Sequence, residues 1–527
     1  MPVFLQVLLI AALLQGCTLD IRKSPQPVPA ELTGSQPQDD RRRQAQQYLA
    51  QALEHEQQQD FLNAAQARLS YHKYLDESAA IKVNSTKIWE NLNRVNKEAL
   101  RARYQAEPRA LSGWVELALI KRTLLTDLNV LQRALTSWQQ NYPAHPANFT
   151  IVGQLRETGR RINTRPQQIA LLLPLRGALR EAATAVRDGF MTAWYNSGRY
   201  RPPLRVYEAN SLNIEQTYTQ ALAEGADFIV GPLDKQALTR LSATTRLTAP
   251  TLALNRIEAV PEAARRTPDE LLPPLMQFSL SPEDEARQVA QRAYADGYDK
   301  ALVIVPDDSW GRRLSGAFRA GWTAAGGVLL ETVRYNPQHN DYAGPVKQAL
   351  NVDASEARIQ ALRQLLGQRL ESRARRRQDA NVIFIAAFPV DARQIVPQLR
   401  FYEAAHIPVY ATSHIFSGNV NPQADADMDG VVFPDLPWIL TPATGTPSVK
   451  SLVNDNFRAA ASAYQRLYAF GADAFNLIPQ LPRLAYEDEA SFNGATGRLS
   501  MSADGAITRT LPWGKIVNGR PELLGGR

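Results

Sequence analysis

From residue 168 onward, short apolar runs alternate with stretches of helical periodicity, and this alternation constrains the fold more than any other feature of the chain. The first run, at 168–175, is apolar without a break after Gln168. A continuous apolar run is typical of a strand that is buried on both faces of a parallel sheet. Strands that alternate strictly with helices predict βαβ units and a doubly wound sheet.

The alternation forms two blocks. In the first block we expect strands at 168–175, 204–207, 227–231 and 250–254 and helices at 179–196, 214–224 and 233–246. In the second block we expect helices at 282–297, 310–325, 343–372 and 390–404 and strands at 300–305, 327–333, 380–386 and 408–411. Two such blocks joined by short crossings have the plan of a type I periplasmic binding protein, in which two lobes surround a cleft.

The predicted fold class is therefore α + α/β, with a helical array followed by a two-lobed α/β domain at 165–527. We expect lobe 1 at about 165–275 and 412–527 and lobe 2 at about 276–411. Helices near 452–482 and a terminal hairpin are expected to complete lobe 1.

The helical array is predicted at 41–162, where the apolar pattern has helical periodicity alone. Helices are expected near 84–105, 110–124 and 127–141. The last pair resembles a degenerate tetratricopeptide repeat, with these residues at the signature positions: Gly113, Trp114, Leu117, Ala118, Ala134, Trp138 and Pro146. Any antiparallel helical hairpin places Ala and Trp similarly. Either reading predicts a stack of helix pairs, a shape usually used for binding.

The N-terminus has the features of an export signal. Residues 1–16 are mostly aliphatic and uncharged, and the run is shorter than the roughly 20 residues that span a bilayer. Leu14-Gln15-Gly16-Cys17 resembles the bacterial lipobox, in which the cysteine is acylated and the preceding peptide is removed. We therefore expect a lipoprotein signal peptide at 1–16 and lipidation of Cys17. The alternative is a buried helix followed by an ordinary core cysteine.

Residues 17–40 are predicted to form a tether. Prolines stand among its polar residues and favour an extended chain. They are Pro25, Pro27, Pro29 and Pro37. Thr18 follows the cysteine, where Asp would resemble the signal for retention at the inner membrane, so we expect an anchor on the periplasmic side of the outer membrane. Because Cys17 is the only cysteine and is consumed by lipid, no disulfide is expected.

The charge pattern excludes few partners by itself. The formal net charge is +7, with local runs at 41–43 and 373–377. Such runs are typical of sites for nucleic acid, anionic lipid or an acidic partner, and more often of a solvated face or linker. Export to the envelope removes nucleic acid from the candidates.

The sequence contains no convincing catalytic motif. The histidines His55, His72, His145, His339, His406 and His414 show no metal-ligand spacing, so neither a metal nor a cofactor is expected. Glu283, Asp284 and Glu285 begin a predicted helix, where they complement its positive end. The segment at 307–309 follows a strand and is interpreted first as a helix N-cap. We therefore expect no enzyme.

Loops after strands are nevertheless where a ligand would bind, because open α/β sheets place their sites beyond the carboxyl ends of strands. Arg176 and Arg256 could hold a carboxylate with two hydrogen bonds. The candidate cleft residues are Arg176, Asn255, Arg256, Asp307, Ser309, Trp310, Thr412, Ser413 and His414. An empty cleft closed by these loops is an equally acceptable interpretation.

The ordered set of segments across the α/β region resembles the LpoA (LppC-type) family of lipoproteins. The segments that carry the resemblance are 169–175, 187–190, 225–233, 252–255, 281–286, 295–298, 397–402, 408–413, 417–419, 437–438, 496–500 and 511–513. The resemblance implies that the α/β domain contacts the periplasmic docking domain of a class A penicillin-binding protein, penicillin-binding protein 1a, and stimulates its transpeptidase. It also implies that the chain itself catalyses nothing.

The sequence features fit three functions to different degrees. A synthase activator accounts for the anchor, the tether and the helical array together. A periplasmic solute receptor would bind an amino acid or a cell-wall fragment in the cleft. An envelope hydrolase has no support in the sequence.

Overall fold

The computed structural model describes residues 36–106, 111–125, 127–198, 200–262, 272–339, 341–367, 371–441, 448–487 and 490–525. The predicted signal peptide, Cys17 and the tether up to residue 35 lie outside the described residues. None of the helices in these ranges combines the length and the apolar character needed to cross a membrane. The chain divides into two compact units, Met1–Trp114 and Val115–Arg527.

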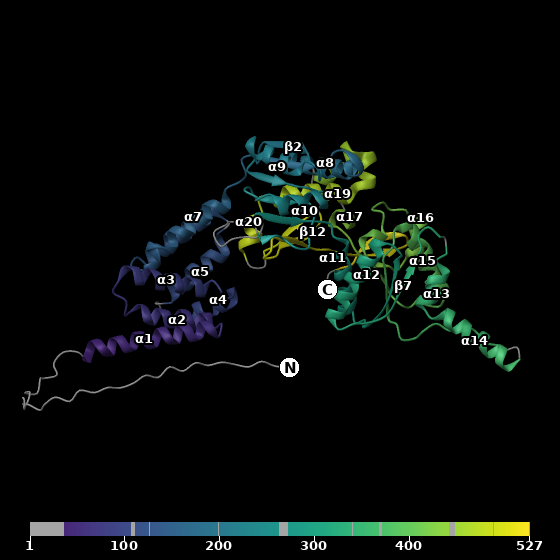
Figure 1. Ribbon diagram of the computed structural model, residues 1–527, viewed down its shortest axis with the longest axis horizontal. Helices are drawn as coiled ribbons and strands as arrows, with labels where there is room; N and C mark the ends of the chain where they lie inside the picture. Colours follow the sequence, from purple (N-terminus) through teal and green to yellow (C-terminus); the bar gives the residue numbers. More distant parts are fainter. Residues whose placement is uncertain are drawn as a thin grey trace, which may run out of the picture. The chain divides into compact units, whose positions relative to one another are not determined.

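The first unit is entirely helical in its described part (Figure 1). Its helices are α1 (Gln36–Gln57), α2 (Phe61–His72), α3 (Ser78–Leu92) and α4 (Lys97–Ala106), followed by the start of α5 (Ser112–Leu124). Helix α1 begins inside the segment predicted as tether. The single helix expected at 84–105 is two helices, and the Asn96 side chain accepts a hydrogen bond from Ala99 N–H at 2.7 Å in the first turn of α4. Asn favours such helix starts over helix interiors.

A polar network joins the first three helices. Arg68 on α2 donates from Nε and Nη2 to the Glu56 carboxylate on α1, at 2.5 and 3.1 Å. Asn91 on α3 donates to Glu56 at 2.7 Å, and Asn84 donates to the Arg68 carbonyl oxygen at 2.9 Å. The hydrogen bond from Arg68 helps to hold the pKa of Glu56 below its usual value. The helix stack is therefore fixed by specific polar pairing as well as by apolar burial.

The second unit begins within α5, so the predicted domain boundary near 162 does not coincide with the division between units. Helices α6 (Leu128–Asn141) and α7 (Ile151–Asn163) belong to this unit, as does the short 3₁₀ helix η1 (Pro146–Phe149). Helix α7 contacts α20 (Leu481–Tyr486) of the α/β region.

Lobe 1 contains a sheet whose strand order is β11-β12-β13-β5-β4-β3-β1-β2. Its strands are β1 (Ile169–Leu173), β2 (Leu204–Glu208), β3 (Phe228–Val230), β4 (Thr251–Ala253), β5 (Leu275–Phe278), β11 (Phe492–Gly494), β12 (Gly497–Met501) and β13 (Ala506–Thr510). Its helices are α8 (Arg180–Asn196), α9 (Ile214–Ala223), α10 (Lys235–Thr244), α18 (Val449–Asn456), α19 (Arg458–Leu477) and α20. Alternate residues of β1 enter the cores on opposite faces of the sheet, as its continuous apolar run predicts.

Lobe 2 contains a second sheet with strand order β15-β14-β10-β9-β8-β6-β7. Its strands are β6 (Lys300–Pro306), β7 (Val328–Tyr335), β8 (Val382–Ile385), β9 (Val409–Ala411), β10 (Val432–Pro434), β14 (Trp513–Val517) and β15 (Arg520–Leu523). Its helices are α11 (Pro282–Ala295), α12 (Ser309–Ala325), α13 (Ala343–Ala349), α14 (Val352–Leu366), α15 (Pro389–Phe401) and α16 (Pro422–Asp425), and α17 (Pro437–Leu440) follows β10.

The lobe boundaries differ from the predicted ones. Strand β10 and the terminal hairpin β14–β15 belong to the lobe 2 sheet, because β10 pairs in parallel with β9 and antiparallel with β14. The chain therefore returns to lobe 1 only after β10 and passes back to lobe 2 between β13 and β14. Strand β5 was not predicted, since buried Gln277 interrupts its apolar run. The helix expected at 343–372 is broken at Asn351, which has a φ of 59°.

Two glycines allow helices α8 and α19 of lobe 1 to pack closely. Helices α8 and α19 cross so closely that a Cβ on Gly189 would lie 2.1 Å from the Tyr468 carbonyl oxygen, and one on Gly471 would lie 2.0 Å from that of Val186. Only glycine allows this approach. The α8–α19 pair therefore sets the position of Arg466 and other α19 residues relative to the sheet.

Candidate binding cleft and lobe junction

A cavity of about 920 Å³ lies between the lobes. Lobe 1 contributes Asn255 and Arg256 after β4, together with Lys235 of α10. Lobe 2 contributes the start of α11 and one side of α12, including Arg313. The lining thus comes from loops and helix ends that parallel βα units bring to the cleft.

The charged side chains of this cavity are largely paired with one another. Asp284 on α11 accepts from Arg287 at 2.5 Å and from Arg256, across the cleft, at 3.4 Å. Arg313 on α12 donates to Glu283 at 2.7 Å. Arg256, predicted as a holder of a ligand carboxylate, is therefore already paired with a carboxylate of the protein.

The pKa of Glu283 reflects these ion pairs. Partial burial raises the pKa of its carboxyl, but hydrogen bonds from Arg313 and Ser281 outweigh this effect and hold the pKa below its usual value. Ser281 is also the N-cap of α11, because its Oγ accepts from Asp284 N–H at 3.1 Å. Glu283 is ionised and paired at neutral pH, so it does not act as a proton donor there.

Asn255 has a structural role within the cavity wall. Its side-chain amide donates to the Leu233 carbonyl oxygen at 2.8 Å, and its side-chain oxygen accepts from Arg256 N–H at 2.8 Å. These bonds fix the loop after β4.

The other predicted cleft residues do not converge on this cavity. Arg176 is exposed after β1, and Asp307 and Ser309 are exposed after β6. The predicted N-cap at 307–309 is confirmed and is Asp308, whose carboxylate accepts from Gly311 N–H at 2.7 Å. Within the described lining, Asn255 and Arg256 are the predicted residues that reach the cavity.

Trp310 and His414 belong to an aromatic group at the carboxyl ends of the lobe 2 strands. Trp310 stacks on Phe388 with ring centroids 4.9 Å apart, and the His414 ring lies edge-on to Trp310 at 5.2 Å. Burial lowers the pKa of His414, and nearby Glu285 acts in the opposite direction. The imidazole is therefore neutral at neutral pH.

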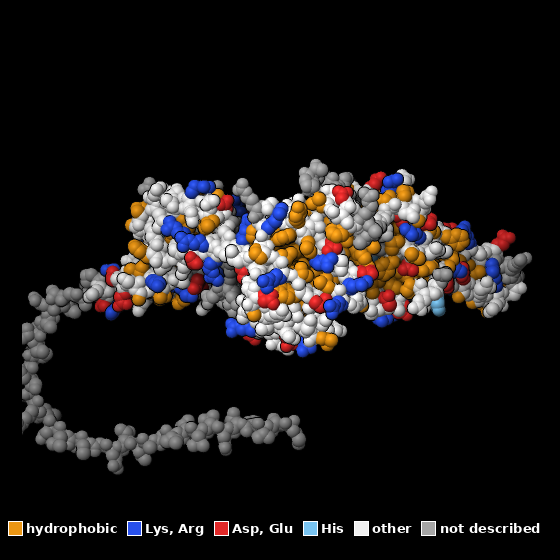
Figure 2. All heavy atoms as spheres, turned by 90° about the horizontal axis from the view of Figure 1, so that it is seen from above, with side chains coloured by type: hydrophobic (Ala, Val, Ile, Leu, Met, Phe, Trp, Pro, Cys, Tyr) orange, Lys and Arg blue, Asp and Glu red, His pale blue; other side chains and the backbone are white. Residues whose placement is uncertain are grey.

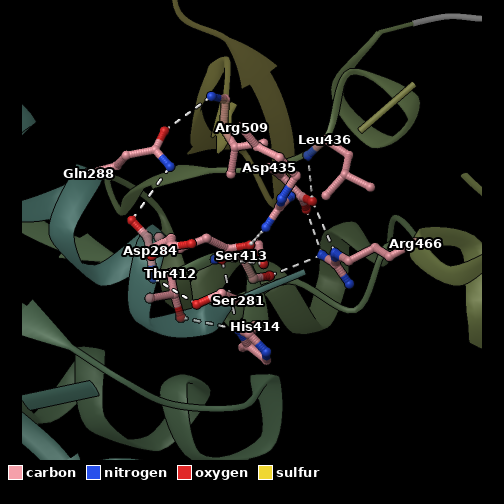
Figure 3. Close-up of polar contacts among 12 residues, drawn as sticks. Ser281, Asp284, Gln288, Thr412, Ser413, His414, Asp435, Leu436, Arg466 and Arg509 are labelled. Carbon is pink, nitrogen blue, oxygen red and sulfur yellow. Dashed lines mark hydrogen bonds and ion pairs between the residues drawn. The ribbon is translucent and has the colours of Figure 1, made fainter. Parts of the chain in front are cut away.

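Thr412 and Ser413 are buried in the junction between the lobes rather than exposed to the cleft (Figure 3). Ser413 donates from its backbone N–H and its Oγ to Glu285 on α11, at 3.2 and 2.7 Å. Arg509 on β13 donates to the other oxygen of Glu285 at 3.4 Å. Glu285 and Arg509 have only 3% and 8% of their surface exposed.

A second buried ion pair completes the junction. Arg466 on α19 donates from Nε and Nη2 to Asp435, at 3.0 and 2.5 Å, and Nη2 also donates to the carbonyl oxygens of Ser413 and Phe416, at 3.0 and 2.9 Å. Burial raises the pKa of Asp435, and the Arg466 guanidinium acts in the opposite direction. Figure 3 shows Arg466 pointing toward Asp435 and Ser413.

We call Glu285, Ser413, Asp435, Arg466 and Arg509 the junction network. Its members come from α11, from the loops after β9 and β10, from α19 and from β13. A buried charge is costly unless it is paired and hydrogen-bonded, so these contacts hold the connecting segments in one arrangement.

Sequence reasoning missed the junction network because its partners are far apart in the chain. Glu285 was interpreted only as a helix-start carboxylate. One available signal was Asp435, which stands alone between Phe433-Pro434 and Leu436-Pro437. A single carboxylate in such an apolar run has to find a buried partner.

The described residues hold no cluster of three or more His, Cys, Asp or Glu side chains that could bind a metal ion. The strongly perturbed carboxyl at Asp473 is engaged by Ala495 N–H, Thr496 N–H and Thr496 Oγ at 2.6–2.9 Å.

Two α/β lobes around a cleft, preceded by stacked helices, define the class: a periplasmic-binding-protein-like domain with a helical N-terminal array. Residues 30–519 match the family model described as "LppC putative lipoprotein". The chain therefore belongs to the LppC lipoprotein family, and the predicted fold class and family are confirmed.

Related proteins agree with this assignment. The chain is 30% identical to a Vibrio antiquarius protein named penicillin-binding protein activator LpoA, over 81% of this chain and 70% of that protein. LpoA from Haemophilus influenzae matches with a TM-score of 0.65 and 26% identity, over 92% of this chain and 82% of that one. The C-domain of H. influenzae LpoA, described as a regulator of PBP1A, matches with a TM-score of 0.51 and 26% identity, over 68% of this chain and 100% of that one.

Proposed function

We propose that this chain is an outer-membrane lipoprotein that binds and activates a class A penicillin-binding protein. The observation that carries the proposal is membership of the LppC family, whose matched relatives are named penicillin-binding protein activators. The partner would be penicillin-binding protein 1a, since the similar H. influenzae domain is described as a regulator of PBP1A. The activity stimulated would be transpeptidation, and the chain itself would catalyse nothing.

The cleft and the junction support a binding scaffold over a solute receptor. A receptor of this fold closes its lobes around a ligand by hinge motion. Here buried ion pairs link the connecting segments, and the cavity arginines Arg256, Arg287 and Arg313 pair with the protein's own carboxylates. Much of the charge that would recognise a small zwitterion is thus already paired within the protein.

The surface also fits a protein partner. Figure 2 shows Lys and Arg side chains interspersed with Asp and Glu side chains on the visible face, with hydrophobic side chains among them. A mixed surface of this kind lacks the concentrated positive charge of nucleic-acid sites.

The test is a pull-down of residues 36–527 against the periplasmic part of the class A synthase from the same cell, with transpeptidation measured in parallel. We expect binding and faster peptide cross-linking. A synthase that neither binds nor responds would contradict the proposal.

A solute receptor is the alternative, favoured by the cavity of about 920 Å³. That volume is within the range typical of small-molecule sites. Calorimetry with amino acids and muropeptides separates the two proposals, because a receptor would show saturable heat at micromolar ligand.

The anchor is proposed at Cys17, with a signal peptide at 1–16. A Cys17→Ser variant is expected to leave the membrane fraction and to appear in the soluble periplasm, measured by fractionation. Membrane retention of this variant would argue against lipidation at Cys17.

The helical array at 41–162 is proposed as a spacer that sets the height of the α/β domain. Deleting residues 41–106, the part of the array that lies in the first unit, while lengthening the tether by a matching reach should preserve stimulation. Complete loss of stimulation would show that the array does more than span distance.

A further inference from the structure

Helix α14 carries apolar side chains that the rest of lobe 2 does not cover. Figure 1 shows α14 extending away from the body of lobe 2. Its buried residues are Val352 and Ser355, both in its first turn. Toward the other end, Leu362, Leu365 and Leu366 are 49%, 81% and 53% exposed. Such leucines cost solubility, and their grouping on one helix end is typical of an interaction site.

After α14 the chain returns along residues 371–377, which we call the basic segment. Between residues 352 and 377 there are seven arginines and three carboxylates. Arg375 is exposed, and within the described part of the chain no carboxylate is paired with its side chain. Arg376 donates to the carbonyl oxygens of Glu403 and Arg377 and contacts the His406 ring, so its charge is solvated by dipoles and is not neutralised by a carboxylate.

A groove of about 410 Å³ lies between α14, this basic segment and the end of α15. Its apolar wall includes Ile359 of α14 and Phe401 of α15, and Phe401 is 74% exposed. Its charged wall includes Arg373 and Arg376. Arg373 pairs with Glu403, but both side chains are largely exposed, and exposed pairs are easily exchanged for a better partner.

We propose that α14, the basic segment 371–377 and this groove form the docking surface for an acidic, apolar segment of the synthase. The proposal rests on the proposed function and names the surface that performs it. Leu365 and Phe401 would bury apolar side chains of the partner, and Arg375 and Arg376 would pair with its carboxylates.

Charge complementarity favours an acidic protein segment over a lipid surface. Glu356 and Glu403 stand in the groove beside the arginines. These carboxylates pair with Lys347 and Arg373, so the charge left for a partner is that of a few arginines at fixed positions. A protein segment can match such positions one by one, whereas a bilayer surface cannot. The groove is also large enough to hold individual side chains of a protein partner. A flat bilayer surface would not need such a groove.

The experiment compares binding of residues 36–527 to the periplasmic part of the class A synthase across matched variants. Leu365→Ser is matched by Leu212→Ser, because Leu212 in lobe 1 is equally open at 85% exposure. Arg375→Glu is matched by Arg246→Glu, an exposed arginine of lobe 1. Neither Leu365 nor Arg375 packs in the core, so folding should be unaffected in every variant.

We expect Leu365→Ser with Arg375→Glu to weaken binding by about tenfold or more, as truncation of an interface anchor typically does, and to reduce the dependence of association on salt. The control pair should bind within about twofold of wild type. Wild-type binding that the α14 variants leave unchanged would overturn this surface while leaving the proposed function intact. Failure of the wild-type chain to bind would overturn both.

Vesicles of phosphatidylethanolamine and phosphatidylglycerol test the lipid alternative with the same variants. We expect no binding of residues 36–527 that depends on Leu365 and Arg375. Vesicle binding that these substitutions abolish would assign the surface to the membrane and overturn the proposal.

Discussion

At the scale of single residues, Glu285 connects the two lobes chemically. It is buried and accepts hydrogen bonds from Ser413 and Arg509. Glu285→Gln keeps the volume of the side chain but leaves Arg509 as a buried charge without a counter-charge. We expect the free energy of unfolding to fall by about 3 kcal/mol, the usual cost of removing one partner of a buried pair, measured by urea denaturation.

Two further variants test whether this loss of stability comes from the uncompensated charge of Arg509. Adding Arg509→Met to Glu285→Gln should recover part of the stability, because the uncompensated charge is removed. Asp307→Asn should change stability by less than about 0.5 kcal/mol, since the Asp307–Arg312 pair is exposed. An equal loss in the double variant would show that Arg509 is not the source of the cost.

Asp473 makes the folded protein more stable at low pH, whereas a carboxylate in a surface ion pair makes it more stable at high pH. Burial raises the pKa of its carboxyl to about 6, whereas the unfolded chain has a carboxyl pKa of about 3.9. The folded protein therefore binds this proton more tightly, and the resulting stabilisation is complete below about pH 4 and is lost as the pH rises through 6.

The Asp473→Asn variant lacks this titration. We expect wild type to gain about 1 kcal/mol in free energy of unfolding relative to Asp473→Asn when the pH is lowered from 7.5 to 5. Denaturation curves of both proteins at the two pH values measure this. A difference between wild type and variant that does not change with pH would mean that the carboxyl titrates normally.

At the scale of secondary-structure elements, the crossing of α8 and α19 depends on two glycines. A Cβ at position 189 would meet the Tyr468 backbone at 2.1 Å. Gly189→Ala should therefore force the helices apart and lower the free energy of unfolding by about 2 kcal/mol, in the range that overpacking costs. Gly153→Ala on α7 is the matched control: nothing lies within 4 Å of its Cβ position. Alanine there should stabilise by about 0.5–1 kcal/mol.

The elements were predictable wherever local pattern determines them. The run at 169–173 predicts a strand buried on both faces, and that is how β1 lies. The hairpin β14–β15 was assigned to the wrong lobe because alternation along a strand does not reveal which sheet edge will pair with it.

The candidate site was predictable only at Asn255 and Arg256, which follow a strand directly. Ser413 satisfies the same rule, but its position depends on Glu285, 128 residues away in sequence.

At the scale of the α/β domain, the junction network determines whether the fold retains the motion of its class. Solute receptors with two lobes open and close by small changes in a few hinge residues. In this domain the segments that connect the lobes are held by the Glu285–Arg509 and Asp435–Arg466 pairs, and Arg256 and Asp284 pair across the cleft. A hinge whose connecting segments are tied by buried charges resists bending, because bending would expose or separate those charges at a cost of several kcal/mol.

We therefore expect one narrow distance between the lobes. Spin labels on Leu212→Cys in lobe 1 and Val328→Cys in lobe 2 report this distance, since both positions are exposed and residues 36–527 contain no other cysteine. The distribution should be unimodal and unchanged by amino acids or muropeptides, whereas Glu285→Gln should broaden it. Two populations in the wild-type background, or a shift on adding a ligand, would contradict a fixed junction and favour the receptor. A partner that docks on one lobe then encounters a surface already held in its binding geometry, which lowers the entropic cost of association.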